Sequence, residues 1–164
     1  LKELSIQDWY HVFRSNLYPV FFIARQAVEL MKNNESSIVN ICSIHALATS
    51  MNMSSYASSK GALLSLTKSL AIDLAPFGIR VNAVLPGAID TPMLRQSIQR
   101  FCTSQEKEQE ILENYKSRTP LKRIGLPEEV AQSIYFFADY EKSSFITGSS
   151  LIVDGGAYSH LSTE

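Results

Sequence analysis

The sequence predicts an α/β fold in which a parallel β-sheet is covered by helices on both faces. Three short runs rich in β-branched residues alternate with longer segments of helical periodicity, in the order helix, strand, helix, strand, helices, strand. Short apolar strands of this kind are typical of parallel sheets, whose crossover connections are helices. A chain of 164 residues, 45% of them hydrophobic, is long enough to form one domain with a sizeable core.

The first expected element is a helix over residues 9–32, with Asp8 as its N-cap. Asn16 lies within it on an apolar face, so its amide must find hydrogen-bond partners inside the fold. A strand is expected at residues 37–42, followed by a polar loop over residues 43–54. The apolar residues of the helix recur at helical spacing and predict one buried stripe: Trp9, Val12, Phe13, Val20, Ile23, Ala27 and Leu30.

The second half of the sequence continues the alternation. Residues 55–75 form the next expected helix, which Pro76 and Gly78 end. The later elements are a strand at 79–85, a weaker helical region at 91–116 with a break at 103–105, a helix at 127–138 and a strand at 149–153. Pro127 suits the first turn of its helix, and the two glutamates after it face the positive end of the helix dipole.

Three parallel strands make a thin sheet, and the strand at 37–42 is expected to have an unpaired edge. A Rossmann-type sheet begins with a glycine-rich turn between a strand and a helix, and residues 1–164 contain no such turn. The sequence also starts with Leu1 and not with methionine. We therefore expect residues 1–164 to form a single domain unit that is the C-terminal part of a Rossmann-type doubly wound parallel sheet.

The composition argues against several classes of partner. The formal net charge is −1, so neither nucleic acid nor an anionic membrane is an expected partner. No apolar run approaches the length that a membrane-spanning helix needs. The two cysteines, Cys42 and Cys102, show no metal-binding or redox spacing and are expected to be reduced thiols, which favours a cytoplasmic location.

A possible acid–base site starts from Tyr56 and Lys60, which lie one helical turn apart. Side chains at this spacing share a helix face, and an ammonium group beside a phenol stabilises the phenolate. Such a phenol can act as a general acid or base. The spacing alone is weak evidence, because a solvent-exposed pair on a helix would look the same.

Two further segments are expected near this pair. Ser43 directly follows the strand at 37–42, and Pro86 and Gly87 directly follow the strand at 79–85. In open parallel sheets, ligands bind beyond the carboxyl ends of the strands, so both loops are expected on the ligand-binding side. The alternative for Ser43 is an ordinary loop residue, and the alternative for Asn16 is a structural polar contact.

Together, Asn16, Ser43, Tyr56 and Lys60 resemble the catalytic tetrad of the classical short-chain dehydrogenase/reductase family. The resemblance covers essentially the whole chain, but the family's glycine-rich turn, its residue that selects NAD or NADP, and its Asn-Ala-Gly strand are absent from residues 1–164. The flanking motifs also resemble the family's: Arg-Val-Asn-Ala-Val-Leu-Pro-Gly at 80–87, Thr-Pro-Met at 91–93, Pro-Glu-Glu-Val at 127–130, Ile-Thr-Gly at 146–148 and Asp-Gly-Gly at 154–156.

The resemblance implies an NAD- or NADP-dependent oxidoreductase that interconverts an alcohol and a ketone on a small-molecule substrate. Tyr56 would exchange a proton with the substrate oxygen, and Ser43 would hold that oxygen. Lys60 would stabilise the phenolate and bind the nicotinamide ribose, and Asn16 would anchor a water linking Lys60 to solvent. The cofactor is expected to contact Tyr56, Lys60, Pro86, Gly87, Ile89 and Thr91.

The resemblance also implies a homodimer or homotetramer, assembled through the helices at 9–32 and 55–75 and through the last strand. The rival hypothesis is a non-catalytic fragment or pseudoenzyme that keeps only these assembly surfaces.

A Ser–His hydrolase using His45 is a weaker alternative, because no Gly-x-Ser-x-Gly elbow is present. The enoyl-reductase branch of the family has a wider Tyr–Lys spacing than the one found here.

Overall fold

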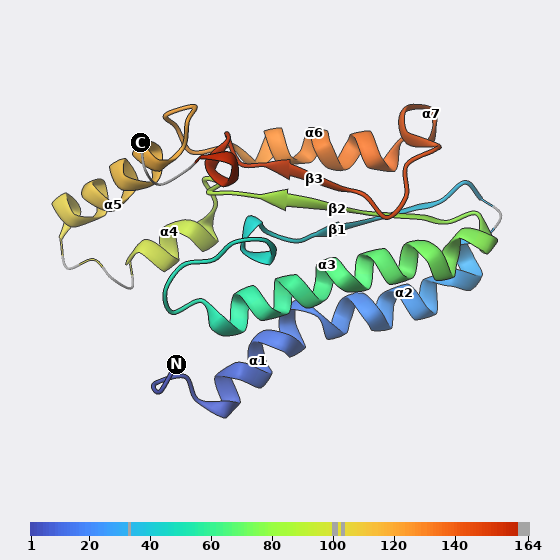
Figure 1. Ribbon diagram of the computed structural model, residues 1–164, viewed down its shortest axis with the longest axis horizontal. Coiled ribbons are helices and arrows are strands. Elements are labelled where there is room, and N and C mark those ends of the chain that lie inside the picture. The colour runs from blue at the N-terminus through green and yellow to red at the C-terminus, as the bar shows by residue number, and fades with distance from the viewer. Residues whose placement is uncertain (33, 100–101, 103, 161–164) are drawn as a thin grey trace.

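A computed structural model of the chain describes residues 1–32, 34–99, 102 and 104–160. Its centre is a three-stranded parallel sheet in the order β1-β2-β3 (Figure 1). The strands are β1 (Ser37–Ile41), β2 (Arg80–Pro86) and β3 (Ser150–Val153). Within the described part of the chain, β1 pairs with β2 alone, so its other edge is open. The predicted α/β class and parallel sheet are confirmed.

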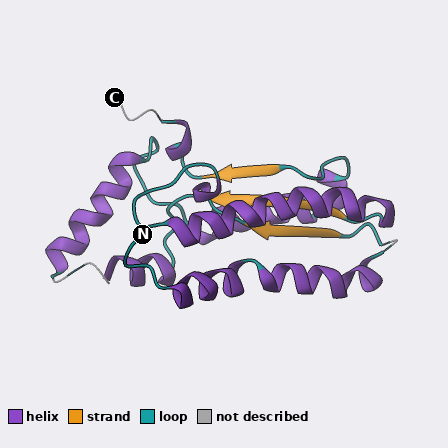
Figure 2. Ribbon diagram, turned by 60° about the horizontal axis from the view of Figure 1, so that its bottom comes forward, coloured by secondary structure: helices purple, strands orange, loops and turns teal. Residues whose placement is uncertain are grey.

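The central strand β2 is buried on both faces because helices cover it from either side (Figure 2). On one face, Ala83 and Leu85 pack against Leu63 of α3 (Ser54–Leu74). On the other face, Val84 packs against Val130 of α6 (Pro127–Ala138). Successive side chains of a strand point to opposite faces, so a continuous apolar run is what a doubly covered strand requires.

The helix predicted over 9–32 is two helices, so that prediction is wrong. The chain forms α1 (Ile6–Asn16) and α2 (Tyr18–Met31), with a break at Leu17. Pro19 explains the break, because it has no N–H to donate to the carbonyl four residues earlier and its ring crowds that carbonyl. The predicted N-cap is also wrong: the Ser5 side chain accepts a hydrogen bond from the Asp8 N–H at 3.0 Å.

The predicted buried stripe is only partly buried. Ile23 is 67% exposed and Leu30 is 82% exposed, whereas Ala24 is the buried residue of α2. Val20 and Val28 of the same helix pack against the core. Helical periodicity marks an apolar face, but it does not show whether the rest of the chain covers that face.

The remaining elements lie close to their predicted bounds. The region expected to be helical at 91–116 contains α4 (Pro92–Gln99) and α5 (Gln105–Arg118). Of the predicted break at 103–105, residue 103 lies outside the described residues. A four-residue helix, α7 (Tyr140–Ser143), follows α6. None of the described helices combines the length and the apolar character that crossing a membrane requires.

Two buried contacts hold the loops around β3 against β2. Asn82 is fully buried; its Nδ2 donates to the Ile146 carbonyl at 2.8 Å, and its Oδ1 accepts from the Ser149 N–H at 3.0 Å. At the other end of β2, a Cβ on Gly87 would lie 2.7 Å from the Asp154 Cβ. The loops that follow β2 and β3 therefore meet so closely that only glycine fits at position 87.

Candidate active site

The carboxyl ends of the strands face the start of α3 and the helices α4 and α5 (Figure 1). Ser43 lies here, two residues after the end of β1, and is 6% exposed. It caps a short 3₁₀ turn, Ile44–Ala46, and its Oγ accepts from the His45 N–H at 3.1 Å. A serine hydroxyl has one donor and two acceptor positions, so this bond leaves the hydroxyl hydrogen for a ligand oxygen.

Tyr56 and Lys60 both lie in the N-terminal part of α3, as their spacing predicts. The Lys60 Nζ lies 5.8 Å from the centroid of the Tyr56 ring and donates to the Ile41 carbonyl at 2.8 Å. Burial lowers the pKa of the Lys60 ammonium, because the charged form loses hydration. The last residue of β1 thus holds the ammonium group beside the phenol.

Asn16 lies at the end of α1, where the helix breaks, and is half-buried. Its Nδ2 donates to the Oγ of Ser59 at 2.9 Å, and Ser59 Oγ donates to the Tyr56 carbonyl at 2.7 Å. The structure therefore connects Asn16 to the turn that carries Tyr56 and Lys60, through a residue that the sequence prediction did not include. The sequence gives no signal for Ser59, because a small residue within a helix is unremarkable by pattern.

His45 lies beside Tyr56, with the two rings edge to face and their centroids 5.7 Å apart. Its Nδ1 is 3.2 Å from the Oγ1 of Thr49, and burial lowers the pKa of the imidazole, which keeps the ring neutral at neutral pH. The hydrogen bond between His45 and Ser43 uses the backbone N–H and not the imidazole. That is not the pairing that a serine nucleophile needs from a general base.

The loop after β2 supplies the other wall of the site. Ile89 forms an isolated parallel bridge with Gly125. The bonds of this bridge run from the Asp90 N–H to the Gly125 carbonyl at 2.9 Å and from the Gly125 N–H to the Ala88 carbonyl at 3.0 Å. The N–H and C=O of Ile89 itself take no part in the bridge. Neither group has a backbone hydrogen-bond partner among the described residues, and a donor beside an acceptor fits a primary carboxamide such as that of nicotinamide.

The other predicted cofactor contacts lie on the same loop. Pro86 is the last residue of β2, and Gly87 follows it against Asp154. The Oγ1 of Thr91 accepts from the Leu94 N–H at 3.3 Å, at the start of α4. Within the described residues, no group of three or more His, Cys, Asp or Glu side chains could hold a metal ion.

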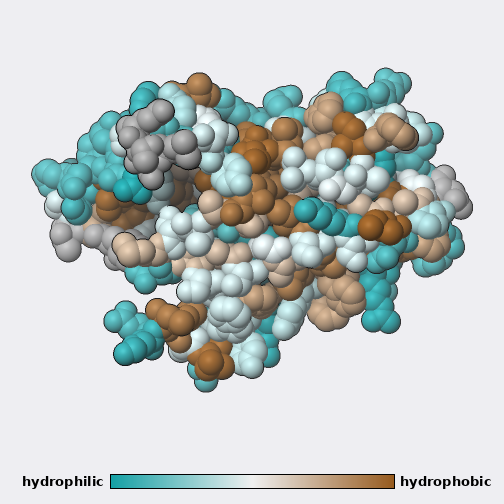
Figure 3. Space-filling view, viewed as in Figure 1, coloured by the Kyte–Doolittle hydropathy of each residue, from teal (hydrophilic) through white to brown (hydrophobic). Residues whose placement is uncertain are grey.

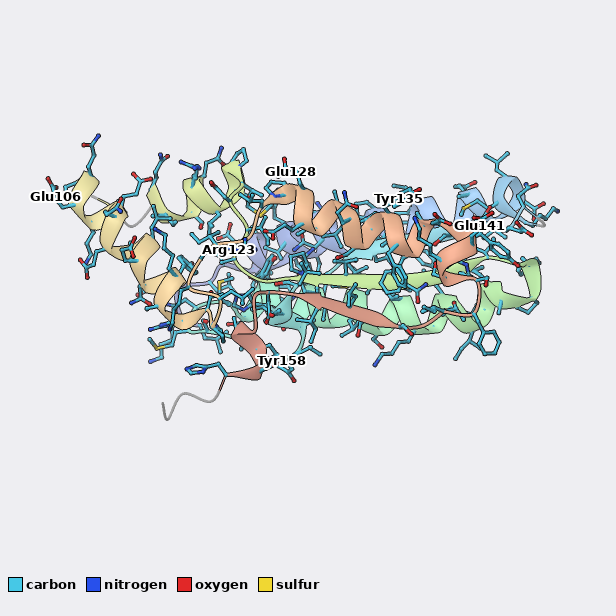
Figure 4. The ribbon with its side chains drawn as sticks, turned by 90° about the horizontal axis from the view of Figure 1, so that it is seen from above. Glu106, Arg123, Glu128, Tyr135, Glu141 and Tyr158 are labelled. Carbon is cyan, nitrogen blue, oxygen red and sulfur yellow. The ribbon has the colours of Figure 1, made fainter. Side chains whose placement is uncertain are left out.

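A cavity of about 450 Å³ lies behind this loop, away from Tyr56 and Lys60. Arg123 borders it and projects between α5 and the start of α6 (Figure 4). Its guanidinium pairs with Glu129, with Nη1 2.7 Å from Oε2. The charges of Arg123 and Glu129 at the edge of the cavity therefore satisfy each other within the protein.

Comparison with known proteins identifies the family to which the chain is similar. A family model described as "Enoyl-(Acyl carrier protein) reductase" matches residues 1–158. The chain is 40% identical over 157 residues to "NADPH-dependent aldehyde reductase 1, chloroplastic" from Arabidopsis thaliana, a match that covers 96% of the chain and 51% of the relative. The chain therefore spans about half the length of this curated relative.

Solved structures show the same likeness in three dimensions. Ligand-free aldohexose dehydrogenase from Thermoplasma acidophilum superposes with a TM-score of 0.93 at 35% identity, over 100% of this chain and 64% of that one. A gluconate 5-dehydrogenase from Burkholderia cenocepacia, in complex with NADP and tartrate, gives 0.85 at 30% identity, over 98% and 60%. The chain belongs to the classical short-chain dehydrogenase/reductase family.

Proposed function

We propose that the full-length protein containing residues 1–164 is an NAD(P)-dependent oxidoreductase that interconverts a small alcohol and a ketone. The observation that supports the proposal is the placement of Lys60 beside Tyr56, with its ammonium bound to the Ile41 carbonyl two residues before the buried Ser43, in a chain of this family. A phenol, an ammonium group and a hydroxyl with a free hydrogen are the groups needed to move a proton to or from a carbinol oxygen.

Each side chain has a distinct task in this proposal. Tyr56 gives its proton to the substrate oxygen during reduction and takes it back during oxidation. Ser43 donates a hydrogen bond to the same oxygen, because its Oγ already accepts from the His45 backbone. Lys60, held by the Ile41 carbonyl, stabilises the phenolate by its charge. Asn16 anchors a water that links Lys60 to solvent.

The cofactor is NAD or NADP in this proposal and supplies the hydride. The Arabidopsis relative is named as NADPH-dependent, and the gluconate 5-dehydrogenase structure holds NADP. Lys60 and Tyr56 would face its nicotinamide ribose, and the peptide groups of Ile89 would bind its carboxamide. Pro86, Gly87 and Thr91 would form the rest of that wall.

We further propose that the protein assembles as a homodimer or homotetramer. On α2, Phe21 is 45% exposed and Phe22 is 57% exposed, and both line a shallow apolar pocket with Leu66 of α3. A second apolar area lies over β3, where Leu151 and Ile152 are partly exposed (Figure 3). Contiguous exposed apolar surfaces of this kind are typical of protein interfaces.

A reducing compartment such as the cytoplasm is the setting we propose. Cys42 and Cys102 both carry free thiols. Free thiols persist where glutathione and thioredoxin keep cysteines reduced.

The substitution Tyr56→Phe in the full-length protein tests the enzymatic proposal. Removing the phenolic proton should lower kcat by about 10²–10⁴-fold, the usual contribution of general acid–base catalysis. The matched control is Tyr10→Phe, at an exposed tyrosine of α1, which should leave turnover unchanged. Thermal unfolding of both variants should resemble that of the wild type, and undiminished turnover of Tyr56→Phe would refute the assignment.

The second candidate is a non-catalytic role, in which residues 1–164 keep only the assembly surfaces. The exposed apolar surface that Phe21 and Phe22 form on α2 is the observation that favours it. Fluorescence titration of the purified 164-residue chain with NADH and with NADPH separates the two candidates for this chain. Weak or absent binding agrees with the non-catalytic role, and tight binding of either dinucleotide contradicts it.

A further inference from the structure

A fully buried serine links the break between α1 and α2 to the turn of α3 that carries Tyr56. Ser59 is 0% exposed. Its Oγ is 2.9 Å from the Asn16 Nδ2 and 2.7 Å from the Tyr56 carbonyl oxygen. The Asn16 and Ser59 side chains come from helices that pack together although they lie far apart in the sequence.

The direction of both hydrogen bonds follows from the chemistry of the groups. A carbonyl oxygen can only accept, so the single hydroxyl hydrogen of Ser59 goes to Tyr56. The Ser59 Oγ can then only accept from Asn16, which must present its NH₂ group and not its carbonyl oxygen. Ser59 thereby fixes which way the Asn16 amide points, a choice that an isolated asparagine leaves open.

The first turn of α3 has no side-chain cap. Met53 occupies the N-cap position and makes no side-chain hydrogen bond to the helix. Uncapped first turns fray, since their N–H groups have no intrahelical partners. Tyr56 lies within this turn, and the two hydrogen bonds of Ser59 connect its carbonyl to α1.

We propose that Ser59 is a positioning residue for the reaction, which orients the Asn16 amide and holds the Tyr56 backbone so that the phenol and the Lys60 ammonium keep their relative placement. The proposal rests on the enzymatic function proposed above. It assigns a role to the hydroxyl group of Ser59, and not merely to the small size that a buried position between two helices requires.

The substitution Ser59→Ala in the full-length protein separates these two roles, because alanine keeps the small size and loses the hydroxyl. If the hydroxyl positions the site, kcat should fall about 10- to 100-fold, as small misplacements of catalytic groups do, with KM for the substrate little changed. Ser58→Ala is the matched control, since Ser58 is exposed in the same turn and should show wild-type kinetics. Wild-type kcat in a folded Ser59→Ala protein would overturn the proposal.

A double-mutant cycle with Asn16→Ala adds a readout that a purely structural role would not give. If Ser59 acts through Asn16, the losses in kcat should be far from additive, and Ser59→Ala should add little to Asn16→Ala. Additive losses would contradict the coupling.

The variant Ser59→Cys serves if Ser59→Ala does not fold, because cysteine retains a weak donor and acceptor. Its kcat should fall below that of the wild type but remain measurable. A wild-type kcat in Ser59→Cys would count against the proposal.

The Tyr56→Phe variant distinguishes failure of this proposal from failure of the proposed function. An inactive Tyr56→Phe with a fully active Ser59→Ala would remove only the role of Ser59. An active Tyr56→Phe would remove the enzymatic function on which that role rests.

Discussion

The thiol of Cys42 lies between the end of β1 and Ser43, 3% exposed. Burial raises its pKa to about 11, although the neighbouring Lys60 charge opposes the shift. A thiol at this pKa has almost no thiolate at pH 8, and the thiolate is the reactive form. Its chemistry should therefore differ from that of the partly exposed Cys102.

We expect Cys42 to resist alkylation in the folded protein. In a full-length Cys102→Ser variant, iodoacetamide at pH 8 should modify Cys42 slowly, and quickly once urea unfolds the chain. The reciprocal Cys42→Ser variant, which keeps Cys102, should react faster in the native state. Mass spectrometry of timed samples measures both rates, and rapid native modification of Cys42 would contradict the expectation.

Some residues of the candidate site could be singled out from the sequence, because their position relative to a helix turn or a strand end is visible in it. Tyr56 and Lys60 stand out by their spacing, and Ser43 by following a strand. Ser59 could not be found in this way, because its importance depends on Asn16, which reaches it only after the helices pack. His45 was considered from the sequence as the base of a Ser–His hydrolase, and the structure places its ring against Tyr56.

Among the elements, α6 begins with a charged arrangement that couples its stability to pH. The Glu129 carboxylate accepts from Arg123 at 2.7 Å and from the Leu126 N–H at 2.8 Å. These two bonds, the first more than the second, lower the pKa of Glu129 from 4.5 to about 2. A carboxylate with a lowered pKa in the folded state stabilises the fold above pH 4.5, and this contribution disappears as the pH falls towards 2.

Replacing Glu129 by glutamine should remove this pH-dependent contribution. At pH 6 the Tm of Glu129→Gln should be lower than that of the wild type, and the difference should shrink as the pH falls from 4.5 to 2. Glu128→Gln serves as the control, because Glu128 is exposed in the same turn and should leave the Tm unchanged. If the difference in Tm between the wild type and Glu129→Gln stays constant with pH, the carboxylate has another role.

The helices also show where prediction from sequence stops. The bounds of α6 matched their prediction because proline and two glutamates mark its start. The break at Leu17 was missed because apolar spacing continues across it, although Pro19 was the signal that could have revealed it. The exposure of Ile23 and Leu30 was missed for a different reason, since an apolar helix face looks the same whether its own chain or another subunit covers it.

For the whole molecule, the parallel sheet followed from the alternation of short strands and helices, whereas the order β1-β2-β3 within the sheet came from the structure alone. Its state of assembly is the next property to test. We expect Phe22→Glu to shift the full-length protein towards a smaller species, because a charge in an apolar interface loses its hydration without a partner. Size-exclusion chromatography with light scattering measures the mass.

Met93→Glu is the control for that experiment, because Met93 is 73% exposed on α4, away from α2. It should keep the wild-type mass. An unchanged mass for Phe22→Glu, or a monomeric wild type, would exclude the α2 face as the interface.

The bridge between Ile89 and Gly125 has a consequence for engineering. The segment between these residues carries α4 and α5, and two backbone hydrogen bonds join its ends. The entropy of closing such a loop changes slowly with its length, so the segment can be exchanged for a longer or shorter one with little loss of stability. Chimeras that take this segment from relatives would keep Ser43, Tyr56 and Lys60 in place, and their activity on different substrates would show whether the segment governs substrate choice.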